Sequence, residues 1–414
     1  MLLSMKALRH WSLRVALVLF ALLVAVLLWH RAELQRLWAV NSLFAAERIV
    51  ANFSAMDRLF FHAPLPLAEG TGMPLPARPR VLPDLSAWLD ERAVTAIVVL
   101  KDGAIVHEQY LRGTQAEDRR ISWSVAKSFL SALFGIVYAE GAIESLDDPV
   151  TRYAPALVGT AYDGARIRDV LQMSSGVRFN EDYFDFHSDI NRMGRVLALG
   201  RSMDAFAQSL DQRERPPGEA WQYVSIDTHV IGMVIRGATG RDIAELMAEK
   251  LLQPIGVESR PYYLTDGDGI AFVLGGLNMT TRDYARFGQL FLQQGEWNGR
   301  QVVPAEWVAE STRASAKTAP GRTRYGYQWW IPADAADGEF LARGIYGQFV
   351  YVNRPAGVVI ALNSADRGFA QRGVFTATVA KFREIAAALQ APQDAEPSRT
   401  AARSTSDEAA VAQP

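Results

Sequence analysis

Residues Ile121 to Ala139 read ISWSVAKSFLSALFGIVYA, a stretch that combines a reactive pair with a wholly apolar helix. Ser124 and Lys127 stand three positions apart at its start, so on a helix their side chains share one face and can touch. After Lys127 the pattern is apolar nearly all round, which is typical of a helix buried inside a domain. We expect this helix to open near Ser124 and to run to Glu140, where Gly141 ends it.

Burial changes the chemistry of this pair. A lysine withdrawn from water loses the hydration of its ammonium, so its pKa falls and the neutral amine is populated near pH 7. Such an amine can take a proton from the neighbouring hydroxyl and turn Ser124 into a nucleophile. A chain of this length holds about one S-x-x-K by chance, usually on the surface. The apolar continuation favours the buried, reactive arrangement.

Further motifs follow in order along the chain. Ile167–Gly176 (IRDVLQMSSG) is a short helix that runs into a turn. Pro216–Ile231 (PPGEAWQYVSIDTHVI) contains Tyr223-Val224-Ser225 before a helix start. Leu341–Pro355 (LARGIYGQFVYVNRP) is a strand whose glycines permit close backbone approach to a ligand.

The order S-x-x-K, Y-x-S and small-x-Gly resembles the serine β-lactamase and penicillin-recognising hydrolase superfamily. The resemblance covers about Thr95 to Ala387 and lies within the class C-like branch of esterases, D-aminopeptidases and nylon-oligomer hydrolases. The pieces ARGIYGQ and GGLNMTTRDYARFGQLFLQQGEWNG look closest to the 6-aminohexanoate-dimer hydrolase-like members. Three motifs in this order are more specific than any one of them.

The resemblance implies a role for each matching residue. Ser124 would be the acylated nucleophile and Lys127 its proton acceptor. Tyr223 would relay protons to the leaving group and later to the deacylating water. The backbone N–H groups of Ser124 and Ile345 would form the oxyanion hole. Ser225 stands where class C enzymes usually have Asn, and it would donate a hydrogen bond to a substrate carbonyl.

The third motif departs from the family pattern. Ala342-Arg343-Gly344 occupies the place of K-T-G or H-x-G, so the usual cation at its first position is gone. That cation helps to hold a substrate carboxylate and to tune the tyrosine, and its loss counts against β-lactamase or transpeptidase activity. Arg343 either replaces the missing charge or faces solvent, and Gly344 keeps the backbone role.

Arg178–Asn191 (RFNEDYFDFHSDIN) is an acidic, aromatic loop. Related hydrolases place such a loop over the pocket, which makes Tyr183 and Asp189 candidate substrate contacts. A solvated loop with its aromatic rings packed underneath fits the same residues equally well.

Composition excludes several other classes of protein. The 414 residues carry 43 basic and 45 acidic side chains, which gives no electrostatic reason to expect nucleic-acid binding. Cysteine is absent, so disulfides, thiolate metal sites and cysteine nucleophiles are excluded. The six histidines show no paired metal spacing, and no G-x-S-x-G or phosphate-binding glycine motif is present. We expect no metal, no cofactor and no obligatory protein partner.

The N-terminus predicts a membrane segment. Lys6, Arg9 and Arg14 precede the apolar run Val15–Trp29, and no small-x-small cleavage site follows it. An uncleaved signal anchor is therefore favoured over a removed signal. The early basic cluster suggests a single pass through the inner (cytoplasmic) membrane, with the catalytic domain in the periplasm or outside.

The pattern of elements predicts an α+β fold: a central antiparallel sheet flanked by helices, with an inserted, mostly helical subdomain. Strands are expected at both ends of the body and helices between them. The expected strands are Thr95–Leu100, Ala104–Tyr110, Tyr325–Ile331, Phe340–Gly344, Phe349–Asn353 and Val358–Asn363. Further helices are expected over Asn41–Asp57, Leu277–Gln294 and Phe375–Leu389.

Four segments follow from these patterns: a cytoplasmic stub and anchor (1–37), a helical and Pro-rich arm (38–94), the hydrolase domain (95–390) and a disordered tail (391–414). The leading hypothesis is a membrane-anchored serine hydrolase that cleaves small amides or esters through an acyl-enzyme. A D-amino-acid peptidase or weak β-lactamase is the rival enzyme. A non-catalytic anchored binding or sensor protein is the alternative of another class.

Overall fold

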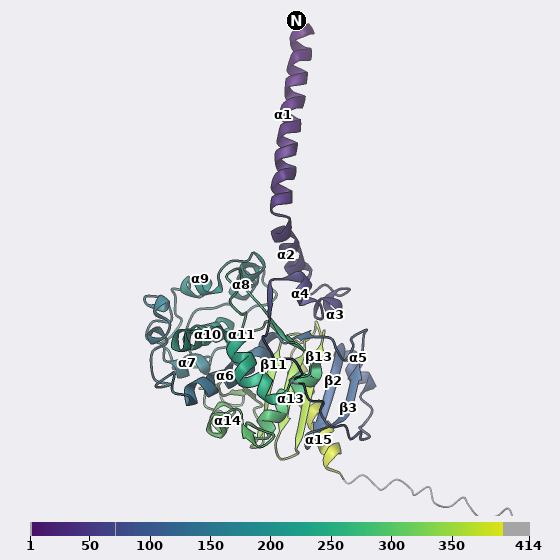
Figure 1. Cartoon of the computed structure of the whole chain (residues 1–414), viewed down its shortest axis with the longest axis vertical. Coiled ribbons are helices and arrows are strands. Elements are labelled where there is room, and N and C mark those ends of the chain that lie inside the picture. Colours follow the sequence, from purple (N-terminus) through teal and green to yellow (C-terminus); the bar gives the residue numbers. More distant parts are fainter. Residues whose placement is uncertain (1, 71, 392–414) are drawn as a thin grey trace, which may run out of the picture.

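Strands from both ends of the body build the central sheet of the computed structural model, which describes residues 2–70 and 72–391 (Figure 1). The hairpin of β2 (Val94–Lys101) and β3 (Ala104–Tyr110) joins the rest of the sheet through β13 (Val358–Ser364). Next to β13 follow β12 (Gln348–Asn353), β11 (Glu339–Gly344), β10 (Trp330–Ile331) and β9 (Arg324–Tyr325). All these pairings are antiparallel, and the α+β class is confirmed.

The β2–β3 hairpin forms where the sequence predicts it. Asp102 and Gly103 take φ values of 49° and 82°, the left-handed conformation that a tight hairpin turn requires. Ile97 and Val99 face one side of the sheet, and Val98 and Leu100 face the other. Because both sides are covered, the strand reads as a continuous apolar run.

Two layers of helices cover the sheet. On one face, α15 (Val374–Gln390) and α5 (Ser86–Glu91) pack their apolar residues against β2, β12 and β13. On the other, α13 (Thr281–Leu292) lies against the same strands, and α6 (Ala126–Ala139) packs behind it. The rings of Phe129 on α6 and Phe287 on α13 stack with centroids 3.7 Å apart.

The helix that the sequence singled out is buried as predicted. A short 3-10 turn, η1 (Trp123–Val125), leads into α6, and every residue of α6 from Ala126 to Val137 is buried. A Cβ at Gly135 would lie 2.1 Å from the ring of Trp307, on α14 (Ala305–Ser311), so this position needs a glycine for close helix packing.

A mostly helical region is inserted between the two ends of the sheet. Its elements are η2 (Val150–Arg152), η3 (Pro155–Leu157), α7 (Ile167–Leu171), α8 (Asp189–Ala198), α9 (Met203–Gln208), α10 (Ser225–Thr239), α11 (Ile243–Met247), η4 (Ala248–Leu252) and α12 (Gln253–Ile255). This agrees with the predicted helical subdomain.

Three predicted elements differ from the structure, and the first is a helix that begins later than expected. The helix expected from Leu277 begins at Thr281, because Thr280 accepts a hydrogen bond from the Asp283 backbone N–H and caps it. The residues before the cap form β6 (Leu277–Met279), which lies in a second sheet with β1 (His62–Pro64), β5 (Tyr262–Leu264) and β4 (Arg120–Ile121). The short strands β7 (Glu296–Trp297) and β8 (Arg300–Gln301) form a separate two-stranded sheet.

The strand expected over Tyr325–Ile331 is instead the β9–β10 hairpin. Gln328 takes a φ of 65° in the turn between the two strands. The chain therefore reverses direction after the two residues of β9. The period-2 pattern of the segment hid this turn, because the residues on both sides of it are aromatic and buried.

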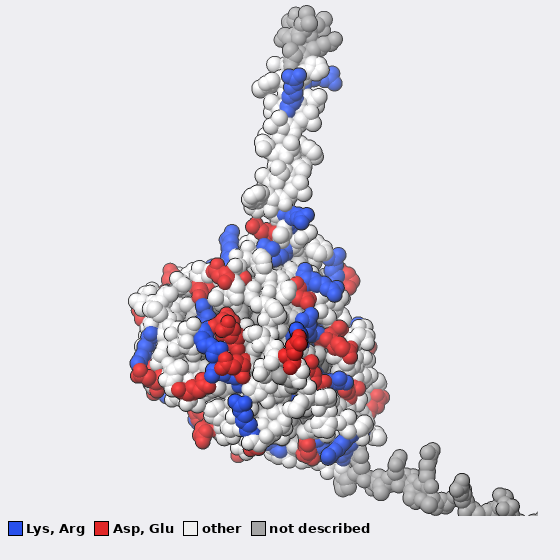
Figure 2. All heavy atoms as spheres, viewed as in Figure 1, with Lys and Arg blue, Asp and Glu red and all other residues white. Residues whose placement is uncertain are grey.

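The N-terminal helix α1 (Leu2–Trp29) projects from the body (Figure 1). Its segment Leu8–Trp29 spans 22 residues, is fully exposed and is long and apolar enough to cross a membrane. Apart from basic side chains near its N-terminal end, the surface of this helix is uncharged, in contrast with the mixed acidic and basic surface of the body (Figure 2). α2 (Arg31–Ser42) then enters the body and packs on α8.

The helix expected over 41–57 is divided into the end of α2 and two single turns, α3 (Ile49–Asn52) and α4 (Met56–Leu59). Part of the Pro-rich segment runs alongside edge strand β3, where the Arg78 N–H donates to the carbonyl oxygen of Ile105 at 2.8 Å. The predicted tail lies outside the described residues, apart from Ala391.

Candidate active site

Ser124 and Lys127 form the centre of the site. Ser124 lies in η1 and Lys127 in the first turn of α6, and Lys127 Nζ donates to Ser124 Oγ at 3.0 Å. A second bond, from Lys127 Nζ to the carbonyl oxygen of Leu274 at 2.7 Å, fixes the amine in place. The predicted contact between the two side chains is present.

Burial determines the charge of this lysine. Lys127 is 1% exposed, and this desolvation lowers the pKa of its amine to about 7, while the charges of Glu181 and Asp227 oppose the shift. The neutral amine is therefore well populated at mildly alkaline pH. An amine in this state, 3.0 Å from Ser124 Oγ, can accept the hydroxyl proton.

Tyr223 closes the second side of the site. It precedes α10, and its ring packs on Trp330 with centroids 5.3 Å apart. Lys127 Nζ lies 5.5 Å from the centroid of the Tyr223 ring. Burial and the charge of Glu181 raise the pKa of Tyr223 well above its usual value, although hydrogen bonding to Ser124 and the charge of Arg343 act in the opposite sense. The phenol is therefore protonated and suited to donate a hydrogen bond or a proton.

The end of β11 closes the third side. A Cβ built on Gly344 would lie 2.7 Å from the carbonyl oxygen of Ser122 and 3.1 Å from the backbone nitrogen of Ser124. Only glycine allows the strand to approach the nucleophile turn this closely. Trp123 and Tyr346, which flank the junction, take φ values of 43° and 57°, a strained conformation of the kind found at functional sites.

Sequence reasoning missed Glu181, a carboxylate in the loop between α7 and α8. It accepts hydrogen bonds from the Ser225 backbone N–H, from Ser225 Oγ at 3.2 Å and from the Tyr183 hydroxyl at 2.9 Å. Burial raises the pKa of Glu181, and the nearby Lys127 lowers it. The loop has four acidic residues, and nothing in the sequence distinguished this one.

A second buried carboxylate, Asp227, was also missed. It lies in the first turn of α10 and accepts a hydrogen bond from the Tyr162 hydroxyl at 2.8 Å. Burial raises the pKa of Asp227 to about 8. On the same helix, the buried His229 pairs with Asp204, Nε2 to Oδ1 at 2.7 Å.

The candidate substrate contacts divide into two groups. Tyr183 and Ser225 line a cavity beside Ser124. Asp189 does not line it: its carboxylate accepts the Asn180 N–H at 2.8 Å and pairs with Arg192 at 3.1 Å, so it holds the loop. The guanidinium of Arg343 lies 4.3 Å from the ring centroid of Phe375 and 5.4 Å from that of Trp330.

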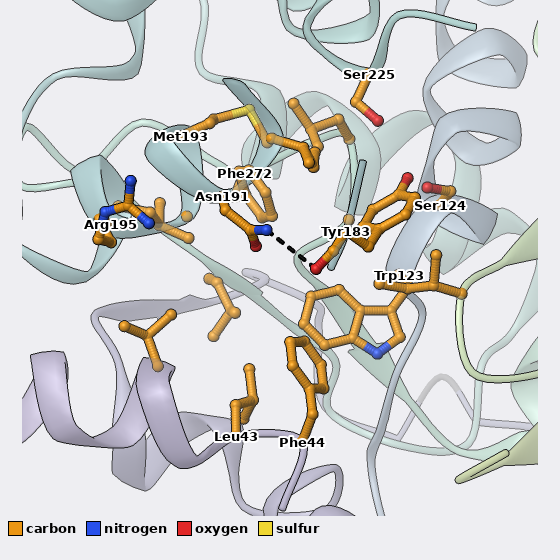
Figure 3. Close-up of a pocket in the computed structure, with 18 of the residues that line it drawn as sticks. Leu43, Phe44, Trp123, Ser124, Tyr183, Asn191, Met193, Arg195, Ser225 and Phe272 are labelled. Atoms are coloured by element: carbon orange, nitrogen blue, oxygen red, sulfur yellow. Dashed lines mark hydrogen bonds between the residues drawn. The ribbon is translucent and has the colours of Figure 1, made fainter. Parts of the chain in front are cut away.

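The cavity beside Ser124 has a volume of about 290 Å³. Figure 3 shows Ser124, Trp123 and Tyr183 on one side and Leu43 and Phe44 of the N-terminal segment on another. Sequence reasoning treated that segment as an arm outside the hydrolase domain and did not predict this contribution. Among the residues that the structure describes, no group of three or more His, Asp or Glu could hold a metal ion.

The chain is similar to known hydrolytic enzymes. The family model described as Beta-lactamase matches residues 88–382. The 6-aminohexanoate-dimer hydrolase of Paenarthrobacter ureafaciens is 31% identical over 299 residues, which cover 68% of this chain and 76% of that protein. A D-aminopeptidase from Brucella anthropi is 25% identical over 172 residues, or 40% of this chain and 32% of that protein.

Among solved structures, a candidate 6-aminohexanoate-dimer hydrolase from Bacillus anthracis has a TM-score of 0.74 at 24% identity, covering 83% of this chain and 95% of that one. This likeness shows a shared fold. The resemblance expected from the three motifs is confirmed, as is the assignment to hydrolytic enzymes. Because the family match spans most of the body, the chain belongs to the beta-lactamase family.

Proposed function

We propose that this protein is a membrane-anchored serine hydrolase that cleaves amides or esters through an acyl-enzyme on Ser124. The observation that carries the proposal is the bond of 3.0 Å between Lys127 Nζ and Ser124 Oγ, made by an amine whose pKa is lowered to about 7. A buried amine near neutrality beside a hydroxyl is a general base beside a nucleophile.

The proposed cycle has two halves. In the first, Ser124 Oγ attacks the substrate carbonyl, Lys127 takes the hydroxyl proton, and the N–H groups of Ser124 and Ile345 bind the oxyanion. The carbonyl then re-forms, the bond to the leaving group breaks, and Tyr223 protonates that group. In the second half, a water molecule gives a proton to the Lys127–Tyr223 pair and attacks the carbonyl of the acyl-enzyme. The bond between the acyl carbon and Ser124 Oγ then breaks, the carboxylic acid leaves, and Ser124 Oγ takes a proton back from the pair.

The names of the relatives support an acyl-transfer substrate. One is called a hydrolase of the 6-aminohexanoate dimer and another a D-aminopeptidase. The second name keeps a D-amino-acid peptidase as the alternative enzyme. The presence of Ser124, Lys127 and Tyr223 at one place counts against a non-catalytic sensor, because a binding scaffold needs neither a lowered lysine pKa nor a nucleophile.

Covalent labelling tests the proposal. The purified full chain is incubated with a fluorophosphonate and, separately, with a labelled penicillin, and the adducts are located by mass spectrometry. We expect the fluorophosphonate on Ser124 and no penicillin adduct. A penicillin adduct would favour the β-lactamase alternative, and adducts with neither reagent would favour the binding protein. Ser124→Ala, which should take up neither reagent, is the matched control.

Membrane anchoring by α1 is part of the same proposal. Its support is the exposed apolar segment Leu8–Trp29 preceded by Lys6, with further basic residues at its start. Full-length protein should pellet with membranes and resist alkaline carbonate extraction. A mature chain that begins after about residue 30 and is recovered in the soluble fraction would show a cleaved signal instead.

A further inference from the structure

The cavity beside Ser124 is apolar over most of its surface. Arg195 is the one charged residue along its described lining, and this guanidinium is held at the mouth, 4.0 Å from the ring centroid of Phe186. An apolar cavity of roughly 150 Å³ holds a benzene ring. The volume of about 290 Å³ therefore accommodates a hydrocarbon chain of roughly eight to twelve carbons.

The segment that follows α1 supplies part of this apolar lining. Leu43 and Phe44 come directly after α2, and Met56 and Phe60 come from α4 and its end. In Figure 1, α2, α4 and α8 lie at the end of the body from which α1 projects. If α1 spans a membrane, the cavity lies in the part of the body that faces the bilayer.

Exposed apolar side chains gather at the same end. Among the described residues after Trp29, eight large apolar side chains are exposed. Five of these belong to α2, to the residue after Phe60 or to the exposed part of the cavity lining. The five are Leu34, Trp38, Phe61, Phe184 and Phe186. Phe184 is 71% exposed and Phe186 57%, although both line the cavity. Aromatic side chains are stable where a membrane meets water and costly in a cluster exposed to water alone.

We propose that the cavity binds the acyl chain of an amphiphilic ester or amide drawn from the membrane, and that Phe184 and Phe186 form the entrance in contact with the bilayer. The inference rests on the proposed function, because it names the substrate class of the same site and uses the anchor. The acyl chain enters the apolar cavity, its carbonyl lies at Ser124, and the polar leaving group points to Tyr223.

A chain-length series tests the acyl site. Values of kcat/KM are measured on p-nitrophenyl esters from acetyl to hexadecanoyl, in detergent below its critical micelle concentration. We expect a maximum between octanoyl and dodecanoyl, at least tenfold above acetyl. A maximum of kcat/KM at the acetyl ester would overturn this inference and would leave the proposed function standing. No turnover at any length, together with no fluorophosphonate adduct on Ser124, would overturn the proposed function and the inference with it.

Gly194 offers a way to shorten the cavity without breaking the fold. It lies on α8 in the cavity lining, and a Cβ built there meets no atom within 4 Å. Alanine also favours the helix over glycine by about 1 kcal/mol, and phenylalanine has a higher helix propensity than glycine. Gly194→Phe should lower the ratio of dodecanoyl to acetyl kcat/KM at least tenfold, and Gly194→Ala should change it much less. An unchanged ratio in Gly194→Phe would contradict the acyl site.

The entrance is tested with substrate in a membrane. Full-length protein is reconstituted in phosphatidylcholine vesicles that contain p-nitrophenyl dodecanoate. Phe184→Ser combined with Phe186→Ser should slow hydrolysis of the vesicle-borne ester several-fold more than that of the same ester in detergent. The matched control is Val158→Ser, which replaces an apolar side chain that is 63% exposed but lines no part of this cavity. Equal effects in vesicles and detergent would contradict uptake from the bilayer.

Discussion

Two walls of one cavity differ in composition and in origin. The catalytic wall is lined by Trp123, Ser124, Ser225 and Ile345, and Ser124 is hydrogen-bonded to Lys127. The N-terminal wall is lined by residues from the end of α2 to the end of α4, and apart from Asn41 these residues are apolar. Under the proposed function, the first wall would perform the reaction on any acyl group, while the second would select the acyl group that enters.

The two walls meet at one aromatic contact. Phe44 of the N-terminal wall stacks on Tyr346 with centroids 4.5 Å apart and packs on Trp123 at 5.6 Å. Both partners flank the nucleophile and carry the positive φ values of the catalytic wall. The N-terminal wall therefore also supports the strained turn in which Ser124 lies. The following predictions test this division, since changes in the catalytic wall should lower rates for every acyl group.

The largest effect is expected for Ser124→Ala. Removing the nucleophile should lower kcat about 10³-fold or more on acetyl and dodecanoyl esters alike. Stability should change by about 1 kcal/mol at most, because a helix-start serine contributes only a cap. Steady-state kinetics and thermal melting measure the two quantities. Activity above a hundredth of wild type on either ester would show that another group is the nucleophile.

Substitution of Lys127 should be nearly as damaging. Lys127→Arg should lose activity about as far as Lys127→Ala, on the order of 10²–10⁴-fold, because a guanidinium keeps its proton. In the wild type the neutral amine is the active form, so kcat/KM should rise about tenfold per pH unit below pH 7 and level off above it. A profile that falls as pH rises through 7 would contradict the base role.

Tyr223→Phe should lower the activity on amides more than the activity on p-nitrophenyl esters. The ring and its packing on Trp330 remain, but the proton for the leaving group is lost. We expect about a 10²-fold loss on amides and a much smaller loss on p-nitrophenyl esters, whose leaving group needs no proton. Equal losses on both would indicate a positioning role for the hydroxyl.

The smallest effect is expected for Glu181→Gln, and it appears as a shift in pH. The negative charge of Glu181 raises the pKa of Lys127, so its removal should move the rising limb of the kcat/KM profile to lower pH. The amide keeps an acceptor for the Ser225 N–H. Asp182→Asn, which removes the charge of an exposed neighbour, should leave the profile in place. Superimposable profiles for Glu181→Gln and wild type would show that Glu181 acts only as a structural acceptor.

Local patterns identified the elements that depend on near neighbours. The Asp102-Gly103 turn, the apolar strands and the buried helix after Ser124 each follow from a few adjacent residues. The start of α13 was placed too early, because Leu277 to Met279 fit a helix or a strand equally until their partners β4 and β5 are known. For the same reason the β9–β10 turn at Gln328 was read as continuous strand.

The sequence by itself determined the family and the three motifs, because the chemistry of a nucleophile and its base needs particular residue types at short, fixed spacings. Only the tertiary structure decided which carboxylates lie near Lys127, since Glu181 is one acidic residue among several in its loop. It also decided that Leu43 and Phe44 line the cavity of a serine about eighty positions away. Apolar side chains carry no directional signal in a sequence, so which surface they cover is fixed only when the chain is folded.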